Sequence, residues 1–180
     1  RSYKVTVFER NDKCAGASIR NFGMIRPVGQ PNGLLYERAL RSKSIWKEVC
    51  ADSGLWFDEF GSLHLAYNKS ELQVIEEFAE ANRNIRPVKV LNKNQTLQKS
   101  QAVNPSELLG ALHSEDDIII EARVAIEKLP AYLHEKFGVE FHFNTAINFI
   151  DHPHVSSGEQ SWQADEIYVC SGADFETLYP

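Results

Sequence analysis

The sequence predicts an α/β fold with an α+β block inserted in it, and three stretches of the chain carry this prediction. Residues 3–8 form a short β-branched and aromatic run, typical of a buried strand, that ends at Glu9. Residues 34–52 place apolar side chains at helical spacing before Gly54, which predicts a helix. Residues 139–149 alternate apolar and polar side chains, which is the clearest strand pattern in the chain.

The inserted block and the end of the chain contain shorter signals. Ser70 and Gln73 have the spacing of a capping box and predict a helix that runs to about residue 82. A helix is also predicted from Ala125 to Phe137, and Pro130 requires that it either kinks or starts late. The other expected elements are strands within 56–67, at 88–91, 112–113, 118–120 and 164–170, a polar helix at 94–101 and a turn at 151–158.

The predicted domain organisation follows from this order. Residues 1–54 and 116–180 would form two parts of one domain whose first strand is missing, and residues 55–115 would form part of a second domain. We expect both ends of the chain to be cut, because it opens on Arg1 and stops just after an apparent strand and turn.

The composition narrows the classes of partner. The formal net charge is −6 and no Lys/Arg cluster offsets it, which argues against nucleic acid and against an anionic membrane surface, so small-molecule partners are favoured. No apolar stretch is long enough to span a membrane, and we expect a cytoplasmic protein. Three cysteines without a CxxC pair exclude a disulfide framework, and the oligomeric state stays open.

Glu9 is the first candidate for a site residue. In dinucleotide-binding folds an acidic residue at the end of the second strand accepts hydrogen bonds from ribose hydroxyls, about 20 residues after a Gly-rich turn. Only eight residues precede Glu9, so that turn is not in this chain. The alternative is a surface charge that ends an ordinary strand.

Two further stretches consist of small residues after a strand. Gly16 and Gly23 lie in a long loop from Asn11 to Gly33, where glycine allows backbone N–H groups to approach a ligand closely. The predicted strand at 164–170 runs into the small-residue turn Ser171-Gly172. The alternatives are a surface loop and a plain strand end.

Together these stretches resemble the D-amino acid oxidase superfamily, which includes glycine and sarcosine oxidases. Residues 4–10, 16–18 and 21–24 are similar to its second strand and flavin-facing loop, and residues 57–65 to the strand that opens its substrate domain. Residues 138–147 and 164–173 are similar to the return to the FAD domain and to a late flavin-contacting turn. The resemblance implies an incomplete Rossmann-like FAD-binding domain with an inserted α+β substrate lobe, without the family's Gly-x-Gly-x-x-Gly turn and its C-terminal half.

The resemblance also implies the positions of the cofactor-binding residues. Glu9 would bind the adenosine ribose, with Arg10 near the adenine and Ile147 against the adenine through its backbone. Ala17 and Ser18 would approach the pyrophosphate. The ribityl chain and flavin ring would be approached by Asn21, Phe22, Gly23, Met24, Ser171 and Gly172.

The implied activity is oxidation of a small amine or amino acid, with FAD as the hydride acceptor, hydrolysis of the imine, and reoxidation by oxygen that yields hydrogen peroxide. Residues 20–27 and 29–31 resemble a bacterial subgroup associated with aminophosphonate breakdown. Arg20 and Arg26 are candidates for binding an anionic group of the substrate, with a solvated loop charge as the alternative. No catalytic residue is assigned and no metal site is expected; His64, His134 and His142 are interpreted as ordinary surface or core residues. The rival functions are a flavoprotein dehydrogenase with another electron acceptor and a non-catalytic fragment unable to retain FAD.

Overall fold

The computed structural model describes residues 3–172 and residue 174, which divide into two compact units. Unit 1 contains residues 1–22 and 121–180, and unit 2 contains residues 23–120. Each unit is a mixture of helices and strands, so the predicted α/β class is confirmed. None of the helices in the described residues is long and apolar enough to cross a membrane.

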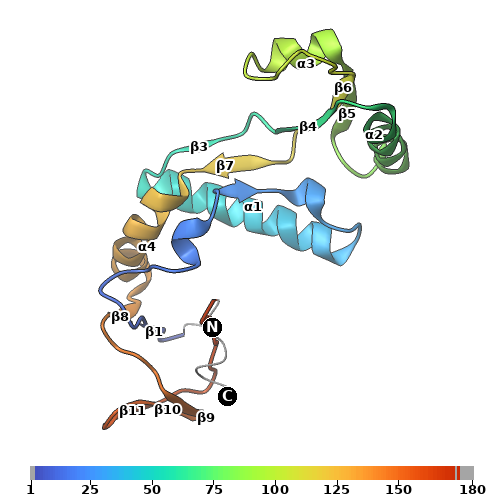
Figure 1. The fold of residues 1–180 in the computed structure, drawn as a ribbon. Helices are drawn as coiled ribbons and strands as arrows, with labels where there is room; N and C mark the ends of the chain where they lie inside the picture. Colours follow the sequence, from blue (N-terminus) through green and yellow to red (C-terminus); the bar gives the residue numbers. More distant parts are fainter. Residues whose placement is uncertain (1–2, 173, 175–180) are drawn as a thin grey trace. The chain divides into compact units, whose positions relative to one another are not determined.

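Unit 1 contains a parallel pair of strands. β1 (Thr6–Phe8) pairs with β8 (Glu140–His142) (Figure 1). In this register Val7 lies opposite Phe141. Helix α4 (Ala122–Phe137) precedes β8 and ends at Gly138, whose left-handed conformation caps the helix. Pro130 lies inside α4, so the helix does not start late. Before it, the 3-10 helix η1 (Ser18–Arg20) follows β1.

The strand expected over residues 139–149 is shorter in the structure. It is interrupted after β8 at Asn144, which has a positive φ of 55°. The turn is held from the opposite strand end, because Asn144 N donates to Asn11 O at 2.9 Å and Thr145 N donates to Glu9 O at 2.9 Å. The backbone N–H groups of Asn144 and Thr145 therefore bond to residues after β1 and do not extend the pairing of β8 with β1.

The last part of unit 1 is an antiparallel meander. It contains β9 (Phe149–Asp151), β10 (His154–Ser157) and β11 (Gln160–Gln163), with β10 in the centre. The turn expected over residues 151–158 is therefore wrong in part, because strand β10 occupies four of these eight residues and turns remain only at 152–153 and 158. Residues 164–170 form no strand, since a strand requires a paired neighbour and none of the described strands pairs with them.

Unit 2 contains two antiparallel three-stranded sheets. In the first, β6 (Gly110–Ser114) lies between β4 (Ser62–Ala66) and β5 (Val88–Asn92) and is buried along its whole length. Helices α2 (Lys69–Asn82) and α3 (Lys93–Lys99) contact this sheet. In the second, β7 (Ile118–Ile120) lies between β2 (Met24–Ile25) and β3 (Phe57–Asp58). The long helix α1 (Leu34–Ser53) contacts β2 and the 3-10 helix η2 (Pro27–Gly29).

The start of α2 differs from the prediction. The capping box is formed by Asn68 and Glu71, not by Ser70 and Gln73: Asn68 Oδ1 accepts from Glu71 N at 2.9 Å, and the Glu71 carboxylate accepts from Asn68 N. Both residue pairs have the same spacing, and asparagine is at least as good a cap as serine. The domain boundaries predicted at 54/55 and 115/116 concern a whole enzyme and stay a prediction.

Candidate functional site

The end of β1 presents Glu9 on a backbone that is fixed on both sides. Glu9 N donates to His142 O at 3.0 Å, and Glu9 O accepts from Thr145 N. Its carboxylate oxygen Oε1 accepts two hydrogen bonds from Asn11, one from the backbone N and one from Nδ2, both at 2.9 Å. These bonds hold the carboxylate by Oε1, and no other described residue donates to Oε2.

The small-residue loop and the turn after residue 170 come together in unit 1. Gly16 has a positive φ of 64°, and Ala17 follows in a right-handed helical conformation. Such alternation turns successive backbone N–H groups to one side, where they can bind an anion. A Cβ on Gly172, which has a φ of 64°, would lie 3.2 Å from the Cβ of Ala17. The structure therefore brings Ala17 and Gly172 into close approach.

Ser171 and Arg10, two further predicted residues of unit 1, differ in whether their polar groups have a partner. The Ser171 hydroxyl is buried and has no hydrogen-bond partner within the described part of the chain. Arg10 forms an ion pair with Asp174, whose carboxylate accepts from its guanidinium. Arg10 follows the end of β1 by two residues, and its charge is already paired.

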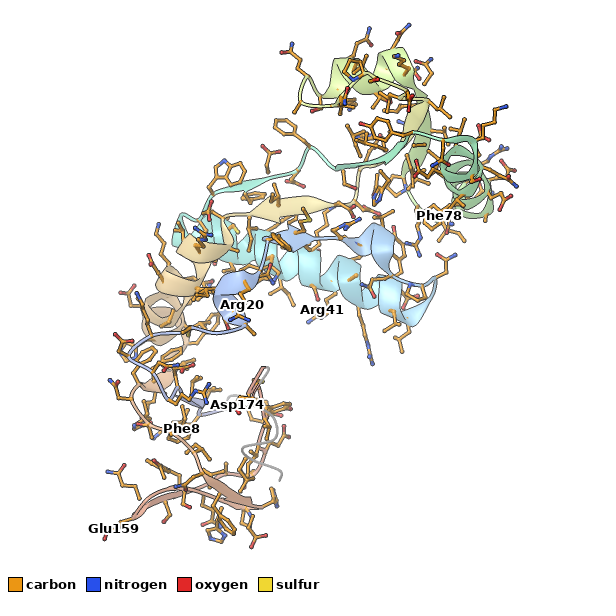
Figure 2. The ribbon with its side chains drawn as sticks, viewed as in Figure 1. Phe8, Arg20, Arg41, Phe78, Glu159 and Asp174 are labelled. Carbon is orange, nitrogen blue, oxygen red and sulfur yellow. The ribbon has the colours of Figure 1, made fainter. Side chains whose placement is uncertain are left out.

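The remaining predicted residues are divided between the units. Asn21 and Phe22 end the first segment of unit 1, with Phe22 82% exposed, and Arg20 lies on η1 (Figure 2). Gly23 and Met24 begin unit 2, where Gly23 O accepts from Ile120 N at 2.9 Å and Met24 pairs with Ile119. Ile147 lies half-buried in the loop between β8 and β9.

Unit 2 contains an open pocket with a volume of about 520 Å³. Its walls come from η2 and the residues after it, from β4 and β6, and from α2, on which Phe78 lies (Figure 2). Arg26 and His64 are the charged and titratable residues of the lining, with Gln30 as a further polar residue. The apolar side chains of the lining are Val28, Pro31, Val74, Ile75, Phe78 and Leu112.

A chain of hydrogen bonds connects Arg26 to a buried carboxylate. Arg26 Nη2 lies 3.4 Å from His64 Nδ1, and His64 Nε2 lies 3.1 Å from Ser62 Oγ. Ser62 Oγ donates to Asp117 Oδ2 at 2.5 Å, and Asp117 is only 2% exposed. Burial lowers the pKa of His64, the Arg26 charge lowers it further, and Asp117 acts in the opposite direction.

A second buried charge holds the wall of the pocket. Arg86 is 5% exposed and donates to the backbone carbonyls of Pro27, Val28 and Gln30 at 3.2, 2.8 and 2.5 Å. It also donates to Asn32 Oδ1 from Nε and Nη2 at 2.9 and 2.6 Å. Its guanidinium lies over the Tyr36 ring at 4.2 Å. Arg86, Ser62 and Asp117 were not predicted from the sequence, because their roles depend on partners 54 to 89 residues away.

Residues 1–179 match the family described as FAD dependent oxidoreductase. The chain belongs to this family. No curated protein matches its sequence. Among solved structures, this chain is similar to glycine oxidase from Geobacillus kaustophilus, with a TM-score of 0.76 and 22% identity over 89% of this chain and 46% of that one. L-proline dehydrogenase from P. horikoshii has a TM-score of 0.75 and 22% identity, over 89% of this chain and 44% of that one. Iminodiacetate oxidase from Chelativorans sp. BNC1 has a TM-score of 0.70 and 17% identity, over 91% of this chain and 47% of that one.

At these identities the solved structures establish the fold of the chain alone, and the chain spans less than half the length of each of the three. The cofactor of the family is FAD. Unit 1 fits part of that group: Glu9 offers a carboxylate oxygen, and the backbone around Gly16 and Ala17 offers N–H groups. The buried Ser171 hydroxyl adds a polar atom beside the close approach of Gly172 and Ala17.

Proposed function

We propose that the intact protein oxidises a small primary or secondary amine or amino acid. When bound, FAD would supply the hydride acceptor for the carbon that carries the nitrogen. The imine product would then hydrolyse, and oxygen would serve as the final acceptor and be released as hydrogen peroxide. The family match carries this proposal, and the half-site for a nucleotide at the end of β1 supports it.

In this proposal the residues of unit 1 hold the adenosine end of the cofactor. Glu9 would accept from a ribose hydroxyl through Oε2, because Asn11 already occupies Oε1. Ala17 and Ser18 would donate backbone N–H groups toward the pyrophosphate, while Arg10, Asn21, Phe22, Gly23, Met24, Ile147, Ser171 and Gly172 keep the roles that the resemblance implies. We place Arg26 at the anionic group of the substrate, since it is the cation in the lining of the pocket of unit 2. Arg20 remains the second candidate.

A full-length protein that includes this chain tests the proposal. We expect it to consume oxygen and form peroxide with at least one small amine from a panel that includes glycine, sarcosine and proline. Turnover that requires an artificial electron acceptor would show a dehydrogenase instead. No turnover with either acceptor, in protein that has retained flavin, would refute amine oxidation. Purified residues 1–180 that show the absorbance of bound flavin would exclude a fragment unable to retain FAD.

The finer proposal is that the substrate is an aminophosphonate. It rests on the resemblance of residues 20–31 to the aminophosphonate-associated subgroup. Turnover of 2-aminoethylphosphonate or its N-methyl form in preference to glycine would support it. Turnover of glycine or sarcosine with none of either phosphonate would remove it. The cytoplasmic location expected from the composition also stays a prediction.

A further inference from the structure

The hydrogen-bond chain behind the pocket of unit 2 favours one protonation state of His64. A guanidinium only donates, so His64 Nδ1 must accept from Arg26. Asp117 is a carboxylate that only accepts, so Ser62 Oγ donates to it and is left to accept from His64 Nε2–H. The chain is therefore consistent with one state, a neutral imidazole with its proton on Nε2 and its lone pair directed at Arg26.

This arrangement leaves the pocket with an uncompensated positive charge. Asp117 lies behind Ser62 and outside the pocket lining, and the α2 residues of the lining, Val74, Ile75 and Phe78, are apolar. Across from His64 on β6 lies Leu112, which is also apolar. Among the described residues, the charged groups that act on His64 are thus Arg26 and Asp117. Buried Arg86 packs on another lining residue, with its guanidinium 5.6 Å from the centre of the Phe78 ring.

An anion that enters the pocket would change the balance at His64. Its charge would offset that of Arg26, which is, after burial, the second of the two causes that lower the pKa of His64. The separation of 3.4 Å between Nη2 and Nδ1 is long for a hydrogen bond, so this contact is the weakest step of the chain. The Nε2–H bond to Ser62 would persist in either state, because Nε2 carries a proton in both.

We propose that Arg26 and His64 form one anion site, in which a small oxyanion accepts hydrogen bonds from both side chains and His64 takes up a proton at Nδ1 as the anion enters. The proton comes from the solvent, and no covalent bond forms or breaks in the ligand. Ser62 and Asp117 hold the ring so that Nδ1 faces the pocket. The inference rests on the proposed function only for the origin of the anion, which would be the carboxylate or phosphonate end of the amine substrate.

The test uses propionate as the probe, with propionamide as its neutral match, on the full-length protein. Calorimetry in two amine buffers with different ionisation enthalpies measures the protons taken up per anion. We expect an uptake that approaches one proton for each propionate bound. The affinity for propionate should fall by up to tenfold for each unit of pH between the pKa of His64 without the anion and its higher pKa with the anion bound. Propionamide should bind far more weakly and without uptake. Binding of propionate without proton uptake, or no binding at all, would overturn the proposal.

Two variants test whether His64 is the residue that takes up the proton when propionate binds. His64→Asn places an amide near the position of Nδ1, whose N–H can donate to the anion but which cannot titrate, so this variant should bind propionate with no proton uptake. His154→Asn, on an exposed residue of unit 1, should behave as the unchanged protein. Uptake that survives His64→Asn would contradict the proposal. If that variant does not fold, NMR titration of the His64 ring in the unchanged protein decides, because its pKa must rise when propionate is added.

The outcome is independent of amine oxidation. Propionate binding with proton uptake in a protein that oxidises no amine would leave the anion site standing and remove the proposed function. Turnover of an amine by a protein that binds propionate without uptake would do the reverse.

Discussion

Replacement of Arg86 by Met should destabilise unit 2 by about 2–4 kcal/mol. Arg86 donates to carbonyls of Pro27, Val28 and Gln30 and to the Asn32 side chain. Gln30 and Asn32 are exposed, so water can replace the guanidinium there. Pro27 and Val28 are buried, and each carbonyl that is left unpaired costs about 1–3 kcal/mol. The desolvation of the guanidinium, which the variant no longer requires, offsets part of this cost.

Arg83→Met is the matched control. It removes the same side chain three residues earlier, where the side chain is 70% exposed and, among the described residues, forms an ion pair with Glu80. Such a surface pair contributes little, so the control should change stability by less than about 0.5 kcal/mol. Hydrogen exchange followed by mass spectrometry on peptides from residues 23–120 measures the opening of unit 2 separately from unit 1.

The contrast between the two variants decides the interpretation. Equal protection of the 27–32 peptides in Arg86→Met and Arg83→Met would refute the role of Arg86 in holding the pocket wall. Arg86→Lys is a second comparison, since it keeps the charge but not the fork of donors that reaches several carbonyls. We expect it to lie between the unchanged protein and Arg86→Met.

Four further changes test other parts of the structure. Glu9→Gln in the full-length protein should weaken FAD binding by about 1–3 kcal/mol in a flavin fluorescence titration, and an unchanged affinity would remove the ribose role. Gly110→Ala should lower the thermal midpoint, because its Cβ would lie 2.4 Å from Leu91 O; an unchanged midpoint would contradict this packing. Burial and then Asp116 raise the pKa of Tyr36 from its ordinary value near 10 to about 12. The free energy of unfolding, measured by chemical denaturation, should therefore fall as pH rises from 10 through 12. A Tyr36→Phe variant that loses the same stability over this pH range would exclude Tyr36 as the cause. Asn92→Ala removes the cap that accepts from Gln95 N and should cost about 1 kcal/mol in urea unfolding; no change would show that the cap is dispensable.

The parts of the fold that were predicted correctly are those with local causes. Helix α1 follows from its apolar spacing and from Gly54, whose left-handed conformation ends it. β1 follows from its β-branched run before Glu9. The strand partner of β1 lies more than 130 residues away, and the sequence pattern contains no information about pairing over that distance. The same limit explains the broken strand after β8, since Asn144 is held by Asn11.

The candidate site shows the same division. Arg26 was predicted as a cation in a loop, and the structure adds the pocket around it. His64 was interpreted as an ordinary residue, because nothing in its own stretch of sequence indicates that Asp117 lies two hydrogen bonds away. A buried charge such as Arg86 or Asp117 can be identified only when its interaction partners are known. A sequence indicates those partners only when they lie close along the chain.

The pocket wall and the proposed anion site are coupled through Val28, which forms hydrogen bonds to both. Its backbone N donates to Asp117 Oδ1 at 3.1 Å, and its carbonyl accepts from Arg86 at 2.8 Å. Asp117 is also the end of the chain that orients His64, so a shift of Val28 moves the carboxylate that holds Ser62. Loss of Arg86 should therefore weaken propionate binding although Arg86 does not line the pocket, and by less than Arg26→Gln, which removes a ligand of the anion itself. An Arg86→Met variant that folds and binds propionate unchanged would show that the two networks are independent.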